Sequence, residues 1–215
     1  MVDNTLSQAH NDTQKGANES NRKSIKRLLK RPKPQSATSA DYEVLIIGAG
    51  IAGISMACHL QQQKNSGFSN AKSAIKRKRK HKENQATKHF LIVEKRTDLG
   101  GTWDLFTYPG IRSDSDALTF GYSFRPWLDH KMLAKGAYIK NYIADTAREF
   151  KVLEHIRYQH EVQQLSWSSR SQQWTAMIKN HATGEVLSVT ANFVVGATGY
   201  YDYENGYRPH FKHEE

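Results

Sequence analysis

The stretch that most constrains the fold runs from Tyr42 to Gly53, where a short apolar run leads directly into three closely spaced glycines. Tyr42–Ile47, which contains the apolar run, predicts a β-strand, and Ile51–Gln63 predicts a helix. Gly48, Gly50 and Gly53 have the spacing of a dinucleotide-binding turn. In such a turn the first glycine bends the chain, the second lets a pyrophosphate approach the backbone, and the third lets helix and strand pack closely. The alternative is a glycine-rich turn without a ligand.

The positive charge of this 215-residue chain is concentrated in two segments, although the formal net charge is +10. Of the 31 Lys and Arg residues, eight lie in residues 1–40 and nine in 64–89, and these segments hold only four of the 21 acidic residues. The remainder is therefore slightly acidic, which argues against a specific nucleic-acid-binding domain.

Both basic segments are polar and lack hydrophobic periodicity. Residues 1–40 predict a disordered basic tail. An alternative is a short amphipathic helix around Leu28 that contacts an anionic membrane peripherally. Residues 64–88 predict an insertion, and its Lys76–Lys82 run is either a solvated loop or a polyanion-binding patch.

The chain has one cysteine, Cys58, and no apolar run of 18 residues. A single cysteine cannot form an intramolecular disulfide and excludes the flavin disulfide reductases, which need a cysteine pair. We interpret Cys58 as a buried packing residue of a cytoplasmic protein. The sequence predicts neither a transmembrane helix nor a secretory signal, and it contains no metal-binding pattern.

The order of the remaining elements predicts an α/β fold. His89–Glu94 is a second strand that ends in an acidic residue, as in folds where this acid binds a ribose. It lies 41 residues after Gly53 rather than the usual distance of about 20, which the insertion explains. Lys95–Asp129 is loop-rich, and Ala137–Phe150 is amphipathic at helical spacing. Three strand-like runs follow, Ile156–Trp167, Trp174–Lys179 and Val186–Val195, and the last enters Ala197-Thr198-Gly199.

Taken together and in this order, these segments resemble the class B flavoprotein monooxygenases, which include flavin-containing and Baeyer–Villiger monooxygenases. The resemblance is carried by the glycine turn, Glu94, Gly100-Gly101-Thr102-Trp103, Tyr108-Pro109-Gly110-Ile111-Arg112-Ser113-Asp114 and Ala197-Thr198-Gly199-Tyr200. The sequence of Gly101–Phe106 is similar to that of a bacterial branch of the family, which includes long-chain alkane monooxygenases. The resemblance implies a Rossmann-like FAD-binding domain over residues 41–215, with a parallel sheet, helices and a three-stranded antiparallel β-meander.

The resemblance also implies a role for each matching residue. The implied cofactor contacts are Gly48, Gly50, Ala52, Gly53, Glu94, Gly101, Thr102, Trp103, Asp104, Arg112, Ser113, Asp114, Phe120, Val162, Ala197, Thr198 and Gly199. The glycine turn would hold the FAD pyrophosphate and Glu94 the adenosine ribose, while Val162 would contact adenine. Thr102, Trp103 and Phe120 would lie on the flavin side. Arg112 and Ser113 would face the nicotinamide of NADPH, and Asp114 would be the catalytic acid near the flavin.

Simpler interpretations of these residues stay open. Asp114 could cap a loop, and Trp103 and Tyr108 could form a packed loop core.

The family places an NADPH-binding domain with its own glycine fingerprint after the Ala-Thr-Gly segment, and the sequence has no second GxGxxG. We therefore expect the N-terminal part of a longer enzyme that does not turn over NADPH by itself.

Three functions follow from the sequence. The first is an NADPH-linked FAD monooxygenase that acts on a small organic substrate and O₂ by Baeyer–Villiger insertion, heteroatom oxidation or hydroxylation. The second is a non-catalytic FAD-binding or dinucleotide-binding module. The third is a protein that associates with polyanions or membranes through its basic segments. The substrate and the oligomeric state are not predicted.

Overall fold

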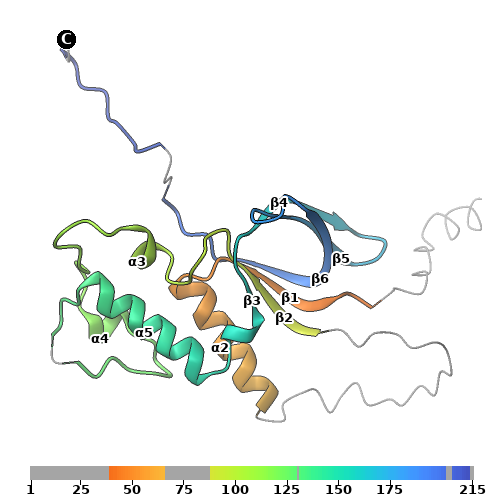
Figure 1. Cartoon of the computed structure of the whole chain (residues 1–215), viewed down its shortest axis with the longest axis horizontal. Helices are drawn as coiled ribbons and strands as arrows, with labels where there is room; N and C mark the ends of the chain where they lie inside the picture. The colour runs from red at the N-terminus through yellow and green to blue at the C-terminus, as the bar shows by residue number, and fades with distance from the viewer. Residues whose placement is uncertain (1–38, 66–87, 130, 202–204, 214–215) are drawn as a thin grey trace, which may run out of the picture. The chain divides into compact units, whose positions relative to one another are not determined.

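The computed structural model describes residues 39–65, 88–129, 131–201 and 205–213. Most of the predicted tail and most of the predicted insertion lie outside these ranges. Figure 1 shows the elements in chain order: β1 (Tyr42–Ile47), α2 (Ile51–Asn65), β2 (Lys88–Val93), α3 (Thr102–Leu105), α4 (Ala117–Phe120), α5 (Gly136–Glu149), the 3-10 helix η1 (Leu153–His155), β3 (Ile156–Arg157), β4 (His160–Ser168), β5 (Gln173–Asn180) and β6 (Val186–Gly196).

The strands form one six-stranded sheet in the order β3-β2-β1-β6-β5-β4. The four strands from β3 to β6 in this order are parallel to one another. On the other side of β6, β5 and β4 continue the sheet as antiparallel strands. The predicted Rossmann-like fold with an antiparallel meander is thus confirmed.

Strand β6 belongs to both parts of this sheet. Ala191 lies opposite Tyr42 of β1 and also opposite Trp174 of β5. The neighbouring Thr190 donates its backbone N–H and its hydroxyl to the carboxylate of Asp41, at 2.8 and 2.7 Å. These bonds hold the register at the start of β1, which matters because a one-residue slip would reverse every side chain of the strand.

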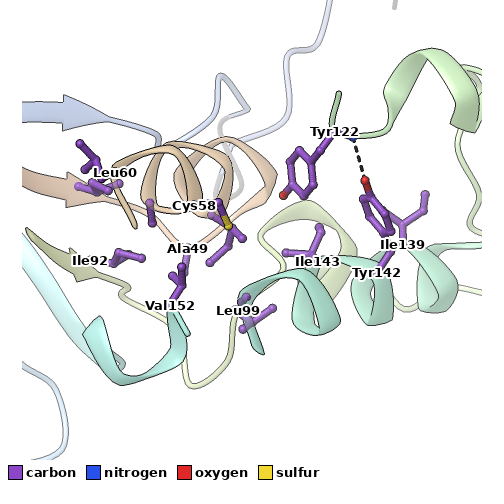
Figure 2. Close-up of a cluster of buried hydrophobic side chains, with 14 of the residues drawn as sticks. Ala49, Cys58, Leu60, Ile92, Leu99, Tyr122, Ile139, Tyr142, Ile143 and Val152 are labelled. Carbon is purple, nitrogen blue, oxygen red and sulfur yellow. Dashed lines mark hydrogen bonds between the residues drawn. The ribbon is translucent and has the colours of Figure 1, made fainter. Parts of the chain in front are cut away.

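The main hydrophobic core lies between the sheet and the helices α2 and α5 (Figure 2). Helix α5 buries Ile139, Tyr142, Ile143, Thr146 and Ala147, the spacing of one face of an amphipathic helix. Val44–Ile47 of β1 and Phe90–Val93 of β2 are wholly apolar, as expected for parallel strands that are covered on both faces. The larger members of the core that are fully buried include Ile46, Ile54, Phe90 and Ile92.

Several element boundaries differ from the sequence-based predictions. The run from Ile156 to Trp167 is divided into β3, which is parallel to β2, and β4, which starts the meander. Gln159 has a positive φ of 58° at the division. The stretch predicted to be loop-rich contains the short helices α3 and α4. No helix within the described ranges is long and apolar enough to cross a membrane.

Candidate functional site

The glycine turn lies where the carboxyl ends of β1, β2 and β6 meet. Gly48 donates its N–H to the carbonyl of Val93 at the end of β2, at 2.8 Å. Ala197, just after β6, donates to the carbonyl of Ile47 at the end of β1, also at 2.8 Å. Ligands of open α/β sheets bind at this edge, outside the carboxyl ends of the strands.

Two of the three glycines are required by the packing of the turn itself. Gly48 has a φ of +106°, and a Cβ there would lie 2.5 Å from the carbonyl oxygen of Ala197. A Cβ on Gly53 would lie 1.9 Å from the carbonyl oxygen of Gly48. Neither position can accept a side chain unless the backbone moves.

Gly50 is different, because a Cβ there would find only ordinary contact, 3.6 Å from Cα of Gly101. It immediately precedes α2, whose first-turn N–H groups have no partner within the helix. Ala52 is exposed in this turn, and the turn carries no acidic residue that would repel an anion. The start of α2 therefore has the geometry of a phosphate-binding helix N-terminus.

Glu94 follows β2 and is buried beside the turn. Its Oε2 accepts the N–H of Ala49 at 2.7 Å, and its Oε1 accepts the N–H of Arg96 at 2.9 Å. A carboxylate can accept about four hydrogen bonds, so these two contacts leave acceptor capacity for a ribose. Glu94 thus orients the glycine turn, and its contact with a ribose stays a prediction.

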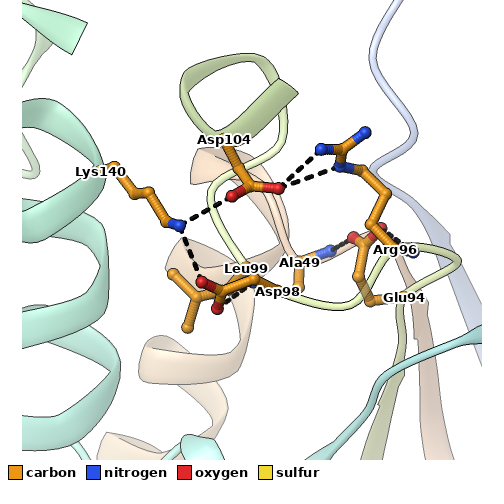
Figure 3. A network of polar contacts seen from close by, with 7 residues as sticks. All are labelled: Ala49, Glu94, Arg96, Asp98, Leu99, Asp104 and Lys140. Carbon is orange, nitrogen blue, oxygen red and sulfur yellow. Dashed lines mark hydrogen bonds and ion pairs between the residues drawn. The ribbon is translucent and has the colours of Figure 1, made fainter. Parts of the chain in front are cut away.

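The segment Gly100–Leu105 lies against the glycine turn. Gly100 donates its N–H to the carbonyl of Ala49 at 3.0 Å, and α3 begins immediately after Gly101. Figure 3 shows that the carboxylate of Asp104 is surrounded by the cations of Arg96 and Lys140. Asp104 therefore points at protein cations.

Trp103 and Phe120, both expected on the flavin side, lie together. Their ring centroids are 6.0 Å apart in an edge-to-face arrangement, and both side chains pack against the main core. Tyr108 is instead exposed, with its ring 6.3 Å from that of Phe106. The Trp103 side chain is therefore partly a packing residue, whereas the exposed Tyr108 side chain is not part of a packed loop core.

The residues Arg112, Ser113 and Asp114 differ in their surroundings. Ser113 is buried, and its hydroxyl donates to the carbonyl of Ser115 and accepts the N–H of the same residue. Arg112 and Asp114 are exposed. The carboxylate that caps α4 belongs to Asp116, whose Oδ1 accepts the N–H of Thr119 at 2.8 Å. Asp114 Oδ1 accepts the hydroxyl of Ser115 in its own loop at 3.5 Å, so the loop-capping alternative for Asp114 stays open.

The other residues that were predicted to contact the cofactor lie at the carboxyl edge of the parallel strands or next to it. Ala197 adjoins Gly48, and Thr198 and Gly199 follow as exposed residues. Val162 packs, partly buried, on the second hydrophobic cluster, which includes Leu45 and Leu91. The structure leaves the ligand contacts of all these residues as predictions.

Sequence reasoning missed a pair of tyrosines that joins the loop segment to α2. The hydroxyl of Tyr142 accepts the N–H of Tyr122 at 2.8 Å and donates to the carbonyl of Arg125. The hydroxyl of Tyr122 donates to the carbonyl of Ile51, in the first turn of α2, at 2.9 Å. Burial is the main cause that raises the pKa of Tyr122 above its ordinary range. Only its aromatic character was visible in the sequence.

Among the described residues, no group of three or more His, Cys, Asp or Glu side chains is arranged to hold a metal ion. The convergent groups are backbone N–H donors and a carboxylate, which suit a nucleotide with phosphate and ribose hydroxyl groups.

Several known proteins are similar to this chain in sequence. Residues 46–132 match the NAD(P)-binding Rossmann-like domain. The chain is 47% identical to MymA of Mycobacterium tuberculosis over 170 residues, which is 79% of this chain and 30% of MymA. It is 42% identical over 170 residues to the FAD-containing monooxygenase EthA of Mycolicibacterium smegmatis, with the same coverage. The chain therefore spans about 30% of the length of these curated relatives.

Solved structures agree with these relatives. The fold is similar to that of OTEMO in complex with FAD and NADP, with a TM-score of 0.57 and 26% identity over 75% of this chain and 26% of OTEMO. A steroid monooxygenase bound to NADP gives a TM-score of 0.56 and 25% identity, with the same coverage. In sequence and in fold, the chain resembles the class B flavoprotein monooxygenases over one segment of those proteins.

Proposed function

We propose that this chain binds FAD and provides the FAD-binding part of an NADPH-linked monooxygenase, which transfers one oxygen atom of O₂ to an organic substrate. The observation that carries the proposal is the convergence of the glycine turn, the start of α2 and Glu94 at the carboxyl edge of the parallel strands. The similarity to FAD-containing monooxygenases and to a structure with bound FAD and NADP supports the choice of cofactor.

The proposal assigns distinct tasks to the chain's own residues. The first-turn N–H groups of α2 bind the pyrophosphate, and the spare acceptor capacity of Glu94 binds the adenosine ribose. Trp103 and Phe120 present an aromatic pair to the flavin. Bound FAD would supply the redox chemistry between NADPH and O₂.

The exposed side chains Arg112 and Asp114 have the charges needed at a nicotinamide–flavin junction. Arg112 would pair with an NADPH phosphate or carboxamide, and Asp114 would adjust the charge near the reacting atoms. Ser113 does not have this freedom, because its hydroxyl already bonds twice to Ser115. We therefore propose that Ser113 shapes the loop between these two residues.

The first experiment measures FAD binding by the whole chain. We expect a flavin absorbance band on the purified protein and a saturable titration of the FAD-free form. Glu94→Gln should weaken binding by about 1–3 kcal/mol, the cost of a mismatched buried hydrogen-bonding group. Glu43→Gln is the matched control, because Glu43 is exposed and its carboxylate accepts from Asn192 on the sheet. Failure of the wild-type chain to take up FAD would disprove the proposal.

A second experiment separates the enzyme from a non-catalytic FAD-binding module. The sequence has a single GxGxxG, so we expect residues 1–215 to bind FAD without oxidising NADPH. In a chimera, this chain's matching segment replaces that of MymA. NADPH oxidation by the chimera would support the monooxygenase, whereas bound FAD without oxidation would support the module.

A contact with membranes or polyanions is a separate hypothesis for the basic segments, 1–40 and 64–88. Apart from their ends, these segments lie outside the described residues. The hypothesis predicts binding to anionic lipid vesicles that is lost at high salt and on deletion of 66–87. Binding that is unchanged by salt and by the deletion would contradict it.

A further inference from the structure

We propose that Asp104 is a positioning residue and that Arg96, Asp98, Asp104 and Lys140 form a charge clamp, which holds the Gly100–Leu105 turn against the glycine turn. The family resemblance implied a direct contact between Asp104 and the cofactor, whereas the geometry points to an indirect effect of Asp104 on the cofactor through Thr102 and Trp103. The effect on FAD rests on the proposed function, but the clamp itself does not.

Both carboxylate oxygens of Asp104 are bound by cations of the protein. Oδ2 accepts from Nε and Nη2 of Arg96, at 3.1 and 2.8 Å, and Oδ1 accepts from Nζ of Lys140 at 2.7 Å. The Asp104 side chain is only 13% exposed. Both oxygens of this carboxylate therefore bind cations of the protein itself.

The clamp joins three separate parts of the chain. Arg96 and Asp98 follow β2, Asp104 lies in α3, and Lys140 lies in α5. Lys140 also binds Oδ2 of Asp98 at 2.7 Å, and Oδ1 of Asp98 accepts the N–H of Leu99 at 2.8 Å. Figure 3 shows Lys140 between the two aspartates.

The turn that carries Asp104 has little room to move. A Cβ on Gly101 would lie 3.1 Å from Cα of Gly50. A Cβ on Gly100 would lie 3.2 Å from side-chain carbons of both Asp104 and Lys140. Movement of α3 would therefore be transmitted to Gly50, where the pyrophosphate is expected to lie.

The charges of the clamp cancel, with two cations and two anions. Burial disfavours the Asp104 carboxylate, but hydrogen bonds from Lys140 and Arg96 outweigh it and lower the pKa of Asp104. Hydrogen bonds to Asp104 and then Asp98 raise the pKa of Lys140. Because Asp104's pKa is lowered on folding, its stabilisation is present above the ordinary value of 3.8 and is lost as the pH falls below it. At neutral pH Asp104 and Lys140 are therefore both ionised.

Hydrogen exchange of the FAD-free chain tests the clamp directly. The reporters are the amides of Trp103, Leu105 and Phe106, which bond to the carbonyls of Gly100, Gly101 and Thr102. In Asp104→Asn we expect these amides to exchange about tenfold faster, as expected for loss of charge-assisted hydrogen bonds. Asp104→Glu should restore part of the protection. The matched control is Asp145→Asn, which removes an exposed ion pair with Arg148 and should leave the turn unchanged.

FAD binding and the visible circular dichroism of bound flavin test the effect on the cofactor. We expect Asp104→Asn to weaken FAD binding about tenfold and to change the flavin spectrum. Lys140→Met should have the same effect, and the double variant should add little, because both changes open one clamp. Unchanged amide exchange in Asp104→Asn would overturn the clamp. Weaker FAD binding with unchanged exchange would identify Asp104 as a direct ligand instead. If the wild-type chain binds no FAD, the proposed function fails, and amide exchange alone decides whether the clamp exists.

Discussion

Alanine substitutions at Gly53 and Gly50 should separate the structural glycine of the turn from the one that is expected to face the ligand. At Gly53 the added Cβ would lie 1.9 Å from the carbonyl oxygen of Gly48, so backbone has to move. Overpacking costs about 1–3 kcal/mol, and a backbone clash belongs at the upper end. Alanine recovers about 1 kcal/mol of helix propensity. We therefore expect Gly53→Ala to lower the free energy of unfolding by about 2 kcal/mol.

The assay for this pair combines thermal unfolding with FAD titration. For a domain of this size, a loss of about 2 kcal/mol lowers the melting temperature by about 4–8 °C. At Gly50 the nearest contact of a Cβ would be an ordinary 3.6 Å, so Gly50→Ala should lose at most about 1 kcal/mol, through the poorer helix cap. The same Cβ would occupy the approach of the pyrophosphate, and we expect FAD affinity to fall by more than about tenfold.

Two results would refute this reasoning. An unchanged melting temperature for Gly53→Ala would show that the turn can yield at low cost. Wild-type FAD affinity in Gly50→Ala would show that the pyrophosphate does not lie against this backbone.

Three further predictions concern buried groups. Tyr142→Phe removes the oxygen that accepts the Tyr122 N–H and should lower the free energy of unfolding, measured in urea, by about 1–3 kcal/mol. Tyr138→Phe, on the exposed side of the same helix, is its control. Equal losses of stability in the two variants would contradict the prediction. Burial raises the pKa of the Cys58 thiol to about 12, so the folded protein should resist thiol reagents at pH 8 and react with them on unfolding. Because the folded pKa of Cys58 is the higher one, its contribution to stability is complete below about 9 and is lost as the pH rises toward 12; a pH titration of unfolding that is flat over this interval would contradict the assignment.

The local parts of the fold were predictable because their signals lie within a few residues. The strand, turn and helix around Gly48 follow from an apolar run and glycine spacing, and β1 has the predicted bounds of Tyr42–Ile47. The spacing of Ile139 and Ile143 predicted α5 to within one residue at each end. Such patterns need no knowledge of the rest of the chain.

The non-local parts were not predictable from the sequence. The resemblance implied the meander and with it the pairing of β5 with β6, but nothing in Val186–Gly196 itself shows that β6 also pairs with β1. The role of Asp104 depends on cations from segments that come together only in the folded chain, and the tyrosine contacts have the same origin. Asp114 and Asp116 each follow a serine, and the structure shows that Asp116 is the cap of α4.

The pairing of β6 with β1 also has a consequence for the order of folding. The bonds between Asp41 and Thr190 join residues that are 149 positions apart, and Gly48 rests on Ala197 over the same span. Contacts of such long range close a large loop and form late. The residues from Asp41 to Ala197 must therefore all have been synthesised before the glycine turn can take its final shape. If FAD binds this turn as proposed, its stabilisation would reach both ends of the domain at once, because the turn rests on Ala197.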